Sequence, residues 1–197
     1  LVLGGVVEHV TWFTDMLPFL TGGDGMGKAG QVLNQSFLAM YIRIAEQGIF
    51  SVTYAPLLHQ ISEFGVLLIC FAFCRVRRLT PDAPEFDLEF SAVTCLTVLM
   101  PTAVIVQHYV YVLPAFLILL VFLINNGVYS IPLFICFALA YTMTSLGAFG
   151  GPFFSQWPFV IIQSSKLLGV LLIWGTLGYL LFRQRGIIGP REPPMPV

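Results

Sequence analysis

Long apolar runs separated by short polar turns dominate the chain after its first third. A hydrocarbon core about 30 Å thick needs about 20 mostly apolar helical residues to span it. Runs of this kind, or close to it, occupy residues 57–74, 88–104, 109–125, 131–149 and 159–182. The pattern therefore predicts an all-α, polytopic helical membrane protein with about five transmembrane helices.

A different pattern precedes these runs. Apolar residues between Phe37 and Ile44 recur at helical spacing, with Arg43 on the opposite side. Polar side chains at 34–36 offer N-caps, and Gly48 is a natural end for the helix. This segment predicts an amphipathic helix that lies at a membrane surface.

Composition and charge narrow the class of protein. Hydrophobic residues make up 57% of the 197-residue chain and charged residues 10%, against about 25% charged in a typical soluble domain. The 9 Lys and Arg nearly cancel the 10 Asp and Glu, so the chain lacks the basic field of a nucleic-acid-binding protein. No Asp, Glu, Lys or Arg occurs from Phe90 to Ser165, and such a stretch cannot form a water-exposed surface.

The arginines predict the orientation in the membrane. Arginines gather at 75–78, after the first span, and again at 183–191, after the last. Because five spans alternate in direction, both groups fall on one side, which the positive-inside rule identifies as the cytoplasm. The predicted organisation is an outer segment at 1–56, a transmembrane bundle at 57–182 and a cytoplasmic, disordered tail at 183–197.

His108 is the ionisable residue of greatest interest in the uncharged stretch. It lies between Gln107 and Tyr109, where one predicted span ends and the next begins. Ionisable groups near the membrane interior are costly and often functional. Two interpretations stay open, a functional histidine and an interfacial histidine within an aromatic belt.

The outward cations also have two interpretations each. Lys166 lies about 10 Å into its span at 1.5 Å per residue, so it is either a snorkelling anchor or a cation that faces an anionic headgroup. Arg43 is either a surface anchor or a fork that binds phosphate. His59 and Glu63 are four residues apart, and without a third ligand this spacing favours a structural hydrogen bond over a metal site.

Two stretches together resemble a known family. Asn34-Gln35-Ser36 precede an apolar helix with Arg43, and Leu99-Met100-Pro101 lead to the segment His108–Pro114. They resemble the C-terminal half of glycosyltransferase family 87, membrane enzymes of GT-C fold related to polyprenol-phosphate-mannose-dependent mannosyltransferases. The resemblance covers roughly residues 10–185. It departs from the family at the turn, where a single His108 stands in place of the paired histidines that members often have.

The resemblance implies a hexosyltransferase in the cell envelope. It implies transfer of a sugar, a hexose such as mannose, from a polyprenyl-phosphate donor to a glycan or glycolipid acceptor. The reaction would occur on the outer face of the bacterial inner (plasma) membrane. The family's catalytic aspartate belongs to an N-terminal half, so we expect this chain to be part of a larger enzyme. No cofactor or metal ligand is implied, and the need for a divalent metal stays open.

The resemblance and the topology assign different residues to the site. His108, as a hydrogen-bond donor in catalysis, matches a family position, and Asn34, Gln35, Ser36 and Arg43 match more weakly. Topology alone adds residues that face outward: Lys166 as a phosphate partner beside Arg43, Gln107 next to the histidine, and Tyr109 with Trp157 as walls of a sugar or lipid groove.

Two other functions compete with this prediction. The chain could be a non-catalytic subunit whose spans pack against partner membrane chains. A transporter or channel needs several polar residues at mid-membrane depth, and the apolar runs 116–124 and 167–173 argue against it.

Overall fold

The computed structural model describes residues 34–74, 83–102, 104, 106–125, 130–146, 149 and 151–184. Throughout these residues the regular structure is helical, as predicted. The elements in chain order are α3 (Phe37–Glu46), η1 (Val52–Tyr54), α4 (Ala55–Phe73), α5 (Pro84–Leu99), η2 (Val106–Val112), α6 (Leu113–Asn125), α7 (Ile131–Ser145), η3 (Phe159–Ser164) and α8 (Ser165–Gln184), where η denotes a 3-10 helix.

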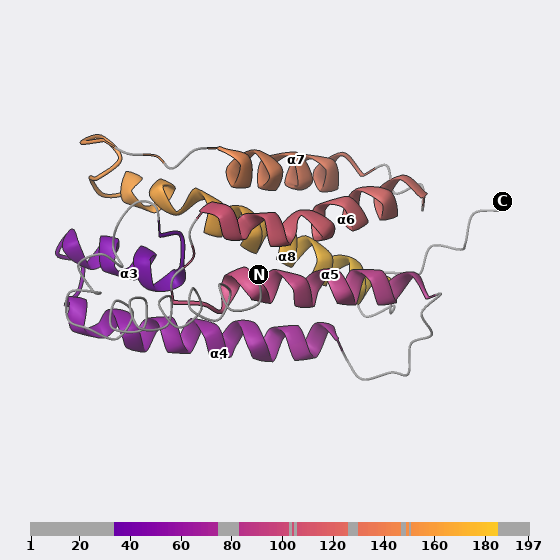
Figure 1. The fold of residues 1–197 in the computed structure, drawn as a ribbon, viewed down its shortest axis with the longest axis horizontal. Coiled ribbons are helices and arrows are strands. Elements are labelled where there is room, and N and C mark those ends of the chain that lie inside the picture. Colours follow the sequence, from indigo (N-terminus) through magenta and orange to yellow (C-terminus); the bar gives the residue numbers. More distant parts are fainter. Residues whose placement is uncertain are drawn as a thin grey trace, which may run out of the picture.

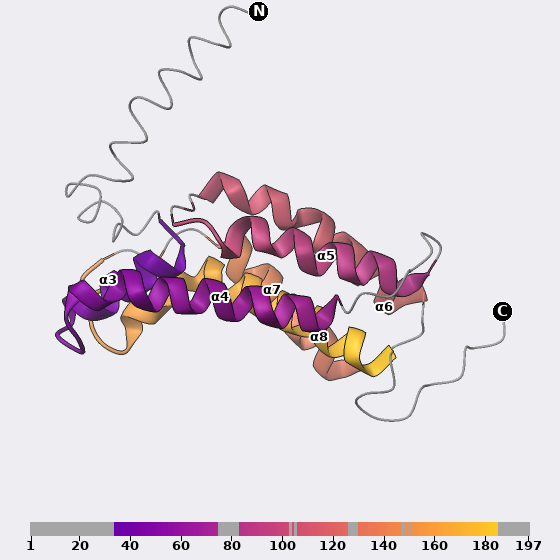
Figure 2. The ribbon, with the colours of Figure 1, turned by 90° about the horizontal axis from the view of Figure 1, so that it is seen from below.

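The helices α4 to α8 run lengthwise through the molecule with alternating direction (Figure 1). Helix α3 lies beside the beginning of α4, and the beginnings of α6 and α8 and the ends of α5 and α7 gather near it. We call this the α3 end and the opposite end the far end. Turned by 90°, α5 and α6 form one layer above α4, α7 and α8 (Figure 2).

Helix α8 is the central element of the bundle and packs against α7, α5 and α4. Two glycines allow its neighbours to approach closely. A Cβ at Gly169 would lie 2.8 Å from the carbonyl oxygen of Ala140 in α7, and a Cβ at Gly178 would overlap the ring of Phe73 in α4. The Phe73 ring also packs 4.9 Å from that of Trp174, between ring centroids.

Local sequence signals account for the helix ends. The Ser36 side chain accepts a hydrogen bond from the Ala39 N–H (3.2 Å) and caps α3. Gly48 follows this helix with φ +77°, the left-handed conformation that favours glycine, as predicted. Pro84 and Pro132 lie in the first turns of α5 and α7, where the missing N–H of proline has no intrahelical partner to lose.

Three segments of the described chain are long and apolar enough to cross a membrane: Val52–Phe73, His108–Asn125 and Phe159–Gln184. The predicted bounds are wrong for two other spans. The 88–104 span is the helix Pro84–Leu99, which is about 24 Å long at 1.5 Å per residue. The 131–149 span ends at Ser145.

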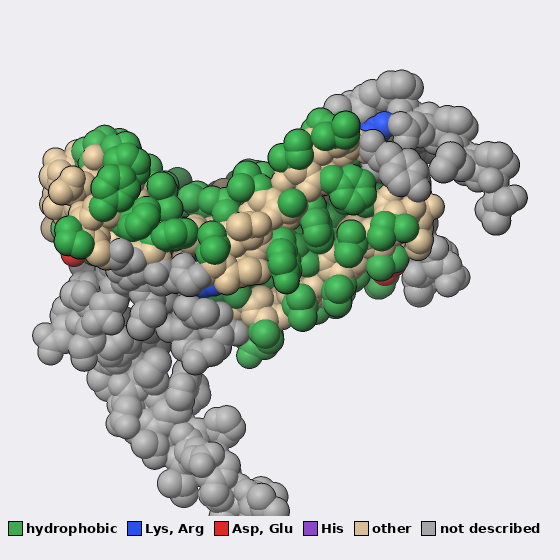
Figure 3. Space-filling view, turned by 90° about the horizontal axis from the view of Figure 1, so that it is seen from above, with side chains coloured by type: hydrophobic (Ala, Val, Ile, Leu, Met, Phe, Trp, Pro, Cys, Tyr) green, Lys and Arg blue, Asp and Glu red, His purple; other side chains and the backbone are tan. Residues whose placement is uncertain are grey.

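Hydrophobic side chains are spread along the long face of the bundle that Figure 3 shows, and few charged groups of the described residues lie among them. Many large hydrophobic residues are exposed, among them Phe64, Phe71, Leu117, Ile131 and Ile135. A soluble protein rarely exposes so much contiguous apolar surface. This surface and the three long apolar helices fit a membrane protein.

Helix α3 differs from the predicted surface helix. Its Arg43 side, expected to face water, is turned into the bundle, and Arg43 is only 2% exposed. Ala39 and Ile42 are buried on the same helix. The guanidinium can be buried because oxygen acceptors at Asn34 and at the distant Ser164 take hydrogen bonds from it, as described below.

The packing of Phe73 on Gly178 gives a test of the fold. We expect Gly178→Ala to lower the free energy of unfolding by about 1–3 kcal/mol, because an added methyl group displaces the ring. Gly175→Ala is the matched control on the same helix, where a Cβ meets nothing within 4 Å. There the change should stabilise the helix slightly. Thermal unfolding of the complete protein in detergent measures both, and equal behaviour of the two variants would contradict the packing.

Candidate functional site

A cluster of buried polar and charged side chains lies at the α3 end. We call it the polar junction and define it as Asn34, Gln35, Ser36, Arg43, Tyr109, Ser164 and Lys166, all of them at most 9% exposed. These residues come from the N-terminal cap and the last turn of α3, from η2 and from the boundary between η3 and α8. Four predicted site residues, Asn34, Arg43, Tyr109 and Lys166, are therefore brought to one region.

Asn34 and Ser36 join the cap of α3 to the turn that follows α5. The Asn34 Oδ1 atom accepts hydrogen bonds from the N–H groups of Ser36 (3.1 Å) and Val104 (3.0 Å). Its Nδ2 atom donates to the carbonyl of Thr102 (3.4 Å), and the Ser36 hydroxyl donates to the same carbonyl (2.7 Å). Buried side chains thus provide hydrogen-bond partners for the backbone N–H and C=O groups that follow the end of α5.

Arg43 bridges two segments with its guanidinium. Its Nη1 atom donates to the carbonyl of Asn34 (2.9 Å), and its Nη2 atom donates to the hydroxyl of Ser164 (2.6 Å). Burial lowers the pKa of Arg43 to about 10, against an opposing effect of Glu46. Since this value is still well above 7, the guanidinium stays charged at neutral pH.

Lys166 is buried in contact with Tyr109. Its ammonium donates to the carbonyl of Thr144 at the end of α7 (2.5 Å) and lies 5.7 Å from the centroid of the Tyr109 ring. Its exposed fraction is 3%. The snorkelling anchor that the sequence left open is therefore wrong, because the side chain turns into the bundle.

The other predicted residues are placed less centrally. His108 is half-buried in η2, and its ring stacks on that of Tyr111 at 6.2 Å between centroids. Trp157 is 49% exposed in the loop before η3, and within the described part of the chain no ring contact or hydrogen bond joins it to Tyr109. The side chain of Gln107 lies outside the described part of the structure.

His59 and Glu63 lie close together on one face of α4, with the His59 Nε2 atom 3.3 Å from a Glu63 carboxylate oxygen. The structural hydrogen bond that their spacing favours does not form, because neither ring nitrogen of His59 has a hydrogen-bond partner among the described residues. Within the described residues, no group of three or more His, Cys, Asp or Glu side chains is arranged to hold a metal ion.

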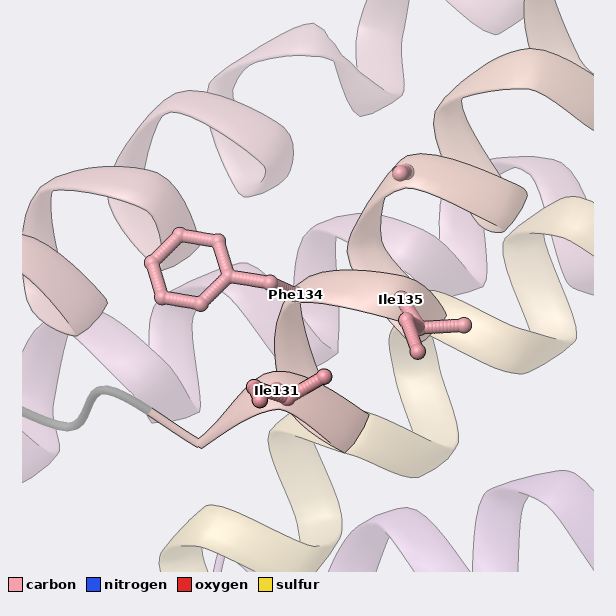
Figure 4. Close-up of a pocket in the computed structure, with 4 residues that line it drawn as sticks. Ile131, Phe134 and Ile135 are labelled. Carbon is pink, nitrogen blue, oxygen red and sulfur yellow. The ribbon is translucent and has the colours of Figure 1, made fainter.

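A shallow hollow of about 410 Å³ lies on α7 toward the far end, away from the polar junction. Ile131, Phe134, Ile135 and Ala138 line it (Figure 4). Ligand sites need a few polar groups to orient the ligand. This wholly apolar hollow on the outward surface provides none from its lining residues.

The sequence missed several members of the polar junction. Gln35 and Ser164 were not predicted as site residues, although Gln163-Ser164-Ser165 form a polar interruption just before Lys166 in an apolar run. That interruption is the signal from which Ser164 could have been found. Gln35 lies within the Asn34-Gln35-Ser36 stretch of the resemblance, but its role was not predicted, because its partners Gln163 and Lys166 lie far away in the sequence.

The polar junction holds two cations together with hydroxyl and amide groups, a set of side chains suited to anionic groups such as phosphate. Comparison of the chain with protein-family models, curated proteins and solved structures finds no match in any of the three.

Arg43 offers a direct test of the junction. We expect Arg43→Lys to lower the free energy of unfolding by about 2–4 kcal/mol, because one ammonium cannot reach both Asn34 and Ser164 and two acceptors lose charge-assisted hydrogen bonds. The control is Arg183→Lys, the same change at a half-buried position in the last turn of α8. Thermal unfolding in detergent compares them. Equal loss in both variants would mean that the bridge contributes little.

Proposed function

We propose that the chain is the C-terminal part of a membrane glycosyltransferase similar to glycosyltransferase family 87 and of GT-C type. It would transfer a hexose, such as mannose, from a polyprenyl-phosphate donor to a glycan or glycolipid acceptor. The reaction would take place on the outer face of a bacterial inner membrane. The family's catalytic carboxylate would come from outside this chain.

One observation carries the proposal: the two stretches that resemble the family touch each other. Residues 34–36 and 108–114 are separated by more than 70 positions in the sequence. The Tyr109 hydroxyl donates to the carbonyl of Gln35 (3.1 Å). Motifs that serve one site must lie together, so this contact supports the resemblance beyond its short sequence matches.

The charges of the polar junction suit the departure of a phosphate. In the proposed step, the acceptor hydroxyl oxygen bonds to the anomeric carbon, the bond from that carbon to the phosphate oxygen breaks, and a carboxylate base takes the hydroxyl proton. The leaving polyprenyl phosphate gains negative charge. Lys166 is held by an uncharged carbonyl and an aromatic ring, so these partners leave its positive charge available to stabilise the phosphate.

His108 directly precedes Tyr109, whose ring centroid lies 5.7 Å from the Lys166 ammonium. Its neighbour Tyr109 belongs to the polar junction, while His108 itself is half-buried. We assign His108 as a hydrogen-bond donor to the phosphate or to the acceptor, and Arg43 and Lys166 as the cations whose field acts on the phosphate.

The proposal includes five membrane crossings by α4 to α8. Helices α5 and α7 are shorter than the three long apolar segments that contain α4, α6 and α8. They nevertheless lie in the same bundle and connect the same two ends (Figure 1). The α3 end then faces outward, and the far end, where α4 and α8 lead toward the arginine groups, faces the cytoplasm.

Cysteine labelling tests the crossings. In a protein with its native cysteines replaced, we expect Gln156→Cys in the loop before η3 to react with a membrane-impermeant maleimide in intact spheroplasts. Asp87→Cys at the beginning of α5 should react only after lysis. Both positions are exposed, so labelling after lysis is the internal control. Reaction of both in intact spheroplasts would contradict the orientation.

A transfer assay tests the activity. Membranes that contain the complete protein, supplied with radiolabelled polyprenyl-phosphate mannose, should incorporate label into an endogenous acceptor. We expect His108→Ala to reduce the rate by about 10²-fold, the usual cost of one donor to a developing charge. Tyr111→Phe is the control, because it keeps the ring that stacks on His108.

Two results would count against this assignment. Near-normal transfer by His108→Ala would remove the histidine from the site. If mannose and glucose donors both fail to give incorporation above that of membranes without the protein, the non-catalytic subunit becomes the better interpretation.

A further inference from the structure

Gln35 is fully buried at the centre of the polar junction, with an exposed fraction of 0%. It lies just before the capping residue Ser36 and so belongs to the beginning of α3. A buried carboxamide is costly unless its donor and its acceptor are both satisfied. The contacts of Gln35 therefore indicate what this side chain does.

The carboxamide of Gln35 holds the boundary between η3 and α8. Its Nε2 atom donates to the carbonyl of Gln163 (2.6 Å), and its Oε1 atom accepts from the N–H of Lys166 (3.3 Å). These two groups lie on either side of Ser164 and Ser165, where the 3-10 helix changes into an α-helix. One side chain thus fixes the backbone from which the Lys166 side chain extends.

The backbone of Gln35 holds the other partner of Lys166. Its carbonyl accepts the hydrogen bond from the Tyr109 hydroxyl, and the ring of Tyr109 lies beside the Lys166 ammonium. We propose that Gln35 is a positioning residue: it holds Lys166 through its side chain and Tyr109 through its carbonyl, and so sets the place of the ammonium.

The position of Lys166 matters because its four-carbon stem has many rotamers. A field that stabilises a leaving phosphate must already be in place when the charge develops. The consequence of Gln35 for catalysis rests on the proposed function, whereas its effect on Lys166 does not. The two are tested by separate measurements.

The chemical reactivity of Lys166 reports its position without any assay of activity. The chain has two lysines, Lys28 and Lys166, which proteolysis and mass spectrometry distinguish. We expect Gln35→Met in the complete protein to raise the rate of reductive methylation at Lys166 by about fivefold or more, because a lost buried hydrogen bond increases local opening. Gln35→Asn, which is too short to reach both partners, should act in the same direction and serves if the methionine variant does not fold.

Gln163→Met is the matched control. Gln163 is also buried, but its side chain donates to Ser155 (3.4 Å), while Gln35 uses only its backbone carbonyl. This variant should leave the rate at Lys166 unchanged. Maleimide labelling of Cys95, a fully buried residue of α5, detects general loosening and should stay unchanged in every variant.

The outcomes separate the two proposals. Wild-type rates at Lys166 in both Gln35 variants, or an equal rise at Cys95, would overturn the positioning role. If transfer activity is present, Gln35→Asn should lower kcat, because the field of Lys166 acts on the charge of the leaving phosphate, and should leave KM for the acceptor unchanged. A rise in KM for the acceptor with an unchanged kcat would also overturn it. Faster methylation of Lys166 in a protein that transfers no sugar upholds the role of Gln35 and contradicts the proposed function.

Discussion

The burial of two cations at one end of the bundle is the constraint on which the arrangement of this end depends. Removing an ion from water costs several kcal/mol unless oxygen acceptors replace the lost hydration. Arg43 finds acceptors on Asn34 and Ser164, and Lys166 finds one on Thr144. These acceptors belong to the cap of α3, the end of η3 and the end of α7. Both cations can therefore be buried only when these segments come together.

The helices place these segments by simple packing. Because neighbouring helices alternate in direction, α7 ends where α8 begins, and the Thr144 carbonyl comes within reach of Lys166. Gly169, one turn beyond Lys166, makes this approach possible: a Cβ there would lie 2.8 Å from the methyl group of Thr144. The absence of a side chain at Gly169 thus helps to set the position of the ammonium. The geometry of the site therefore depends on the packing of α7 against α8.

Features that depend on local sequence could be predicted, and those that depend on distant contacts could not. The helical class and the end of α3 at Gly48 follow from periodicity and backbone preference. The beginning of α5 was predicted four residues late because its acidic first turn is not apolar, although Glu85 and Asp87 favour a helix N-terminus. The inward turn of Arg43 could not be predicted, since its acceptor Ser164 lies 121 residues away. The two interpretations of Lys166 stayed open for the same reason.

The cost of burying these cations is connected with the proposed chemistry. In water, an ammonium acts weakly on a phosphate because the solvent screens it and must reorganise as charge moves. In the polar junction, Lys166 is held by the Thr144 carbonyl and the Tyr109 ring, so in the proposed reaction its field would be present before the phosphate leaves. An exposed lysine would cost less to fold but would stabilise the leaving group less. Folding stability alone therefore does not favour a buried cation that is held by uncharged partners. The proposed transfer of a sugar from a phosphate would favour it.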